Sequence, residues 1–257
     1  MNAPPVNEWI LAPLFSAVRF VGEEAKVGGL LKRALTHLEN GRPFLELTVQ
    51  HLIAMGKTED LEPIQRLLVA APIQEQWATE LRNTDYAVLN AHSLVAIWGA
   101  LEACVEDIVV AILAKDPAAM ASIATAGIRV NSDRMTSTPA DGDLRILYRK
   151  IEDAVRVKYD VVQTQENILN LFGLSAGCLE HKSALLSANA LRNAIVHRGG
   201  IIDDKSVRQA PALASLIGTT CIITCTEFLK YHEAVSACLV ALVGSVVASP
   251  YVVRVGG

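Results

Sequence analysis

The sequence is short of aromatic residues, has no excess of positive charge, and contains no glycine- and serine-rich linker. Aromatic residues make up 5% of its 257 residues, and 23 basic residues stand against 27 acidic ones. A net charge of −4 excludes a histone-like basic coat, but it leaves room for a local basic patch. The hydrophobic fraction of 51% excludes a disordered chain. Alanine, valine, leucine and isoleucine supply most of this apolar content, which favours packed helices.

The cysteines do not form the pattern of a disulfide framework or of a zinc site. There are five of them, and Cys221 and Cys225 are four residues apart with no histidine or cysteine pair nearby. We therefore expect reduced thiols in a cytoplasmic protein, with no metal and no cofactor. The first residues lack a basic stretch followed by an apolar run, so we expect no secretory signal.

One segment raises the question of a membrane anchor. No charged residue lies between Glu233 and Arg254. A membrane-spanning helix needs about 20 apolar residues, and Gly244 and Pro250 reduce the convincing apolar run to about 15. This length favours a buried core helix within residues 234–248. A membrane anchor stays open as the alternative because the segment is strongly hydrophobic.

A long amphipathic helix is predicted over residues 85–115. Its apolar residues recur at intervals of three and four, as a helix with one buried face requires. Asp116 and Pro117 end this helix, because proline lacks a backbone donor and restricts the residue before it. Upstream, Pro72 separates two predicted short helices at 61–71 and 73–82. In the helices before them, breaks are predicted at 28–29, 40–43 and 56–60.

The helical period is lost between residues 120 and 143, where we expect a long loop with a short strand at 128–130. Helical patterns resume downstream. Strand signals are weak except at 221–226 and 250–255, where β-branched residues cluster and a strand is expected. The predicted downstream helices cover residues 144–157, 165–172, 180–197 and 211–248, the last of them continuous or broken. The predicted fold class is all-α.

The segment from residue 185 to residue 204 carries the residues with the clearest chemistry. A predicted helix ends at Gly199 and Gly200, which supply a left-handed cap. Asn193 and His197 are four residues apart and share one face, and the long side chain of Arg192 can reach around to them. Arginine neutralises charge on a phosphate and histidine moves a proton near neutral pH, so the pattern indicates phosphodiester cleavage. The alternative is that His197 only stabilises the helix C-terminus.

The series Arg192-Asn193-x-x-x-His197 resembles the signature of HEPN domains, which are small helical bundles and in many cases metal-independent endoribonucleases. Residues 96–103, AIWGALEA, resemble the first core helix of that family, with Glu102 at its acidic position. The resemblance covers residues 85–248. It leaves residues 1–82 as a helical extension of unknown role.

The resemblance implies a mechanism and a set of partners. Two protomers pair so that both motifs face one cleft, and single-stranded RNA enters it. The ribose 2′-OH attacks the adjacent phosphate, leaving a 2′,3′-cyclic phosphate and a 5′-OH. His197 moves the proton, Arg192 holds the phosphate, and Asn193 orients the histidine or the phosphate. For Glu102 two interpretations stay open: it contacts the motif from the facing helix, or it is a carboxylate at the rim of an amphipathic helix. Many such proteins are toxins or antiviral effectors that an antitoxin or other regulatory partner restrains.

Basic residues near the motif are candidate RNA contacts. Five of them lie on or near the predicted helix 144–157: Arg145, Arg149, Lys150, Arg156 and Lys158. Arg129 and Arg134 lie in the loop before this helix, and Arg198 follows His197. They would form a basic wall for the RNA, or else a solvated face paired with neighbouring carboxylates. Two other functions stay open: a non-catalytic HEPN dimerisation or adaptor module, and a membrane-associated helical protein.

Overall fold

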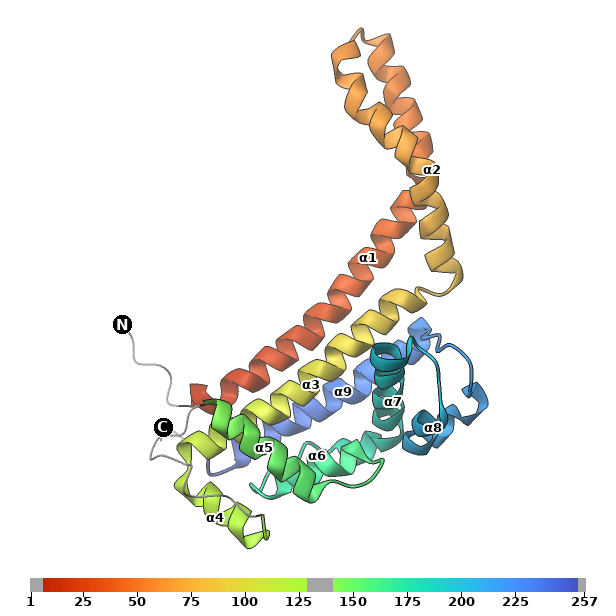
Figure 1. Cartoon of the computed structure of the whole chain (residues 1–257). Coiled ribbons are helices and arrows are strands. Elements are labelled where there is room, and N and C mark those ends of the chain that lie inside the picture. The colour runs from red at the N-terminus through yellow and green to blue at the C-terminus, as the bar shows by residue number, and fades with distance from the viewer. Residues whose placement is uncertain (1–6, 129–140, 254–257) are drawn as a thin grey trace, which may run out of the picture. The chain divides into compact units, whose positions relative to one another are not determined.

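Helices make up most of the chain that the computed structural model describes, residues 7–128 and 141–253. Figure 1 shows their order along the chain. The α-helices are α1 (Glu8–Ala54), α2 (Leu61–Asn83), α3 (Ala87–Lys115), α4 (Pro117–Thr125), α5 (Asp141–Val155), α6 (Val161–Asn170), α7 (Lys182–Arg198), α8 (Asp204–Gln209) and α9 (Cys225–Ala248). Within the described residues, β-pairing is limited to two isolated bridges. The predicted all-α class is confirmed.

Several predicted breaks in the first helices are wrong. α1 runs without interruption through Gly28, Gly29 and Pro43, and α2 runs through Pro72. A proline inside a helix removes one hydrogen bond, but it does not end α2, and Ala71, directly before Pro72, is buried. Local propensity is thus not decisive at this position.

The predicted loop after residue 120 is partly helical. α4 begins at Pro117, and the Asp116 side chain accepts a hydrogen bond from the Ala118 N–H at 2.9 Å, so the residues that end α3 also start α4. Of the strand expected at 128–130, the structure describes Ile128 alone. Arg129 and Arg134 also lie outside the described residues.

The two strand signals expected near the C-terminus, at 221–226 and 250–255, are also wrong over the described residues. α9 begins at Cys225, inside the first signal, and residues 250–253 form no strand. β-branched residues are compatible with helices and turns where packing favours them. The predicted last helix, 211–248, is broken into the 3₁₀ helix Pro211–Leu216 and α9.

The chain divides into two compact units that are interleaved along the sequence. The larger unit contains Met1–Glu23, Leu94–Cys221 and Leu229–Gly257, and the smaller one contains Glu24–Ser93 and Ile222–Phe228. α1, α3 and α9 each contribute residues to both units. This division differs from the expected boundary at 82–85 because the first turns of α1 belong to the larger unit. His232, for example, contacts the Val21 carbonyl oxygen at 3.3 Å.

The core of the larger unit is built on α3 and α9. Trp98, Leu101 and Ile108 of α3 are fully buried. α9 buries one stripe of small and apolar side chains at helical spacing: Ala234, Val235, Cys238, Leu239, Leu242 and Val246. In the described residues, α9 is also the one helix long and apolar enough to cross a membrane, with 39% of its most apolar window buried.

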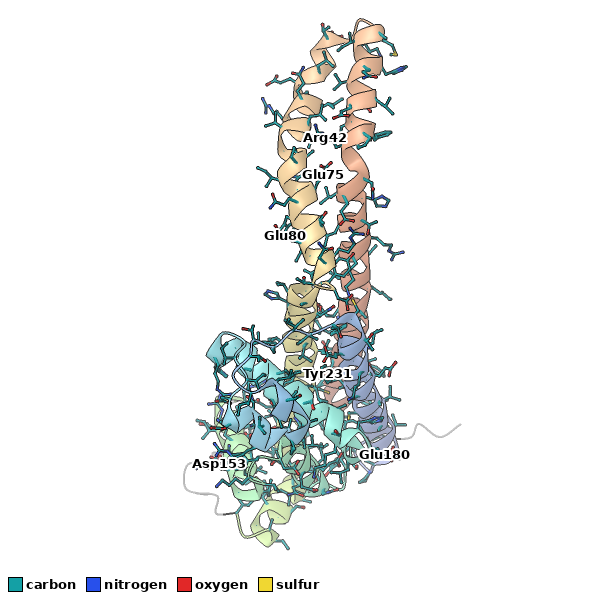
Figure 2. All side chains as sticks on the ribbon, turned by 90° about the vertical axis from the view of Figure 1, so that its right-hand side faces the viewer. Arg42, Glu75, Glu80, Asp153, Glu180 and Tyr231 are labelled. Carbon is teal, nitrogen blue, oxygen red and sulfur yellow. The ribbon has the colours of Figure 1, made fainter. Side chains whose placement is uncertain are left out.

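The smaller unit is a pair of helices with a thin core. Figures 1 and 2 both show the C-terminal part of α1 beside α2, and in Figure 2 Arg42 and Glu75 lie between them. Leu35, Ala78 and Leu81 form the buried cluster of this unit.

Candidate functional site

The predicted end of the motif helix is confirmed, and a pair of glycines terminates it. Gly199 and Gly200 adopt left-handed conformations, with φ of 59° and 84°. The N–H of Gly200 donates to the Ala194 carbonyl at 2.9 Å. A Cβ atom on Gly200 would lie 3.4 Å from the Cγ2 atom of Thr220, so glycine also allows the next loop to approach closely. The turn fixes where α7 stops and leaves His197 in its last turn.

The Arg192 guanidinium is held between two helices. Its Nη1 donates to the Asn193 Oδ1 at 2.9 Å, and its Nη2 donates to the Glu102 Oε2 of α3 at 3.2 Å. Its Nε is buried and has no hydrogen-bond partner among the described residues. The Arg192 and Glu102 side chains keep 25% and 37% of their surface exposed, so solvent still reaches the pair. Because the guanidinium is planar and donates to two fixed acceptors, it is oriented more firmly than a lysine ammonium would be.

Asn193 connects the anchored arginine to the histidine. Its Nδ2 donates to the Oδ1 of Asn189, which is buried, at 3.2 Å. His197 lies one helical turn further on, about 6 Å along the axis and on the same face as Asn193. The His197 side chain is exposed and makes no hydrogen bond or ion pair with any described residue. The motif therefore presents a fixed guanidinium and an accessible imidazole on one helix.

The structure gives Arg198 a different environment from that of Arg192. Its Nη1 donates to the Asp203 Oδ1 at 2.9 Å and to the Ser206 Oγ at 3.0 Å. Asp203 also accepts the Ser206 N–H at 2.8 Å, which caps α8 and lowers the pKa of the Asp203 carboxyl. Arg198 thus joins the end of α7 to the start of α8. Its expected role as an RNA contact stays a prediction.

Arg145 and Arg149, on one face of α5, also differ from each other. The Arg145 guanidinium pairs with the carboxylates of Glu106 and Asp107 on α3, each at 2.8 Å. Arg149 is exposed and makes no ion pair with a described residue. Arg149 is therefore the better candidate for a phosphate contact, because the charge of Arg145 is already neutralised.

A polar pocket of about 380 Å³ adjoins the motif, and the sequence did not reveal it. Its lining includes Glu102 and Asn193, the two acceptors of the Arg192 guanidinium. Three carboxylates (Glu102, Glu152 and Asp160) and three cations (Arg156, Lys158 and Lys205) also line it. The available signal was the short polar break at 156–160 between two helical patterns.

Burial and charge perturb one carboxyl group of this pocket. Burial raises the pKa of Glu152, and the carboxylates of Asp153, Glu102 and Glu106 raise it further, whereas the guanidinium of Arg156 opposes the shift. A carboxyl group with a raised pKa in a cleft is a feature often found at functional sites.

No cluster of three or more histidine, cysteine, aspartate or glutamate side chains suited to a metal ion occurs among the described residues. The five cysteines form no disulfide among the described residues, and Cys104, Cys178 and Cys238 are buried. No model of a known protein family, no curated protein and no solved structure matches this chain.

Proposed function

We propose that this chain is a HEPN-like, metal-independent endoribonuclease that uses Arg192 and His197 of α7. The observation that supports it best is the arrangement of α7: the Arg192 guanidinium is fixed by Glu102 and Asn193, one turn away from an exposed His197. The motif resembles that of the HEPN family in sequence, and the helical fold agrees with the all-α class of that family.

The proposed reaction is an internal transesterification of RNA. A histidine takes the proton of the ribose 2′-OH, and a bond forms between O2′ and phosphorus. The bond between phosphorus and O5′ breaks, and the leaving oxygen receives a proton from a second histidine. The products are a 2′,3′-cyclic phosphate and a 5′-OH. Arg192 stabilises the negative charge that develops on the phosphate oxygens.

The requirement for two histidines points to a dimer. Exposed apolar side chains surround the motif: Val196 is 49% exposed, Ile201 41% and Ile217 49%. The loops that carry Ile201 and Ile217 are joined by a hydrogen bond from the Gly218 N–H to the Ile202 carbonyl at 2.8 Å. We place the pairing surface here, because burying this patch against a second copy brings the two His197 side chains into one cleft.

The direct test is incubation of the purified full-length chain with RNA in the presence of a chelator. We expect fragments that end in 2′,3′-cyclic phosphate, and we expect His197→Ala to reduce cleavage at least about 100-fold. His92→Ala is the matched control because His92 is exposed on α3 and has no assigned chemistry. Absence of cyclic-phosphate ends with the wild-type chain would refute the proposal.

A growth assay separates the nuclease from the adaptor function. Expression of the intact chain should impair growth if it acts as a toxin or as a defence effector, and the His197→Ala form should not. Equal growth with both forms, together with no cleavage in vitro, would favour the non-catalytic adaptor. A membrane-associated protein would instead sediment with membranes until α9 was replaced.

A further inference from the structure

The pocket beside the motif lies where the RNA chain must continue. Asn193 and Glu102 line it, and both also hold the Arg192 guanidinium. A nucleotide adjacent to a phosphate bound at Arg192 would therefore reach this pocket. Its volume of about 380 Å³ falls within the range of about 300–1,000 Å³ that is common for small-molecule sites.

The wall of the pocket contains an aromatic side chain in an unusual backbone conformation. Tyr159 has a φ of 66°, which is unfavourable for a residue with a side chain. It lies in a tight turn closed by a bridge between Val157 and Asp160. The Lys158 Nζ lies 5.0 Å from the ring centroid of Tyr159, and the guanidinium carbon of Arg208 lies 5.6 Å from it. The ring is thus fixed by two cations at the side of the pocket.

The pocket also contains polar groups that suit a nucleotide. Neither Lys158 nor Lys205 forms an ion pair with a carboxylate of the described residues, so neither charge is neutralised by a carboxylate and both can bind a phosphate. The Oε1 atom of Gln209 is buried and accepts no hydrogen bond from any described residue. A buried acceptor of this kind requires a donor, and the exocyclic amino groups of adenine, cytosine and guanine are such donors.

We infer that this pocket binds the nucleotide next to the scissile phosphate of a single-stranded RNA. In this arrangement Lys158 and Lys205 contact its phosphate, Tyr159 forms a wall against its base, and Gln209 accepts a hydrogen bond from the amino group of the base. Uracil has no exocyclic amino group, so it binds less well at this position. The inference rests on the proposed function for its substrate and extends it to a specific binding position.

RNA binding to a variant that does not cleave RNA tests the pocket independently of the reaction. The full-length chain carrying His197→Ala is titrated against a fluorescent single-stranded oligoadenylate, and anisotropy is recorded at fixed salt. Adding Lys158→Gln and Lys205→Gln should weaken binding about tenfold and reduce its salt dependence. Lys230→Gln is the control for these changes, because Lys230 is exposed on α9 and does not line the pocket.

Gln209→Leu tests the recognition of the base. We expect it to remove most of the preference for oligoadenylate over oligouridylate, a change of about tenfold. Melting curves show whether each variant is folded, and the two lysine variants are surface changes that leave the core intact. Equal affinity of the lysine variants and the Lys230→Gln control would overturn the pocket assignment, even if the wild-type chain cleaves RNA. If the wild-type chain cleaves no RNA but the lysine variants bind more weakly than the control, the binding site stands and only the proposed reaction fails.

Discussion

Replacement of Glu102 by glutamine tests whether the ion pair with Arg192 positions the guanidinium for chemistry. Glutamine has nearly the same shape and keeps an oxygen that accepts the Nη2 donor, but it removes the negative charge. In the wild-type chain, the Arg192 Nη2 and the Glu102 Oε2 are 3.2 Å apart. Glu102→Gln therefore isolates the contribution of the charge from that of side-chain volume.

The exposure of the two side chains sets the magnitude of the effect. With 25% and 37% of these side chains exposed, water screens the pair strongly. Coulomb's law gives about 5 kcal/mol at this distance for an effective dielectric constant of 20, and about 1.3 kcal/mol for bulk water. Desolvation and side-chain entropy reduce these values, so a net contribution of about 1 kcal/mol is expected for a partly exposed pair. For a chain of this size, that lowers the melting temperature by about 2–4 °C.

Steady-state cleavage of an RNA oligonucleotide should then show a lower kcat without a rise in KM. Loss of a negative charge beside the bound phosphate favours substrate binding, so KM should stay constant or fall. A less firmly held guanidinium stabilises the transition state less well, so kcat should fall about tenfold. A change confined to folding would alter the amount of active protein but not KM. A rise in KM at unchanged kcat would refute the positioning role.

Three further predictions concern pH, cysteine reactivity and the core. The pKa of Glu152 is raised above its ordinary value of 4.5, so the folded chain holds this proton more tightly than the unfolded chain. The stability that the protonated Glu152 contributes is therefore lost as the pH rises through the folded pKa. RNA binding should weaken over the same pH range, because Glu152 gains a negative charge beside Glu102, Glu106 and Asp153. Glu152→Gln should remove this pH dependence in an anisotropy titration. Burial raises the pKa of the Cys104 thiol to about 12. Mass spectrometry after brief alkylation at pH 8 should therefore find labels on Cys221 and Cys225 but not on Cys104. Labelling of Cys104 in the native chain would contradict the packing of α3. Trp98→Ala should destabilise the chain by about 3–5 kcal/mol, because the ring is fully buried, and thermal unfolding should show this as a large drop in melting temperature.

The apolar periodicity of α3 and the glycine pair after α7 were readable from the sequence because both are local. Residues at intervals of three and four lie on one helix face wherever the helix packs, and two successive glycines after a helix end it by their backbone freedom alone. Pro72 shows the limit of such rules. It is a local breaker, but α2 continues through it to Asn83.

The sequence by itself determined the helical class and the end of α7, and it predicted Arg192, Asn193 and His197 as site residues. Only the tertiary structure decided that Glu102 anchors Arg192, that Arg198 joins α8 instead, and that a polar pocket adjoins Asn193. The physical reason is distance along the chain. Glu102 and Arg192 are 90 residues apart, and no pattern of propensity or spacing specifies which side chains of two such helices will meet until both helices are packed in the same core.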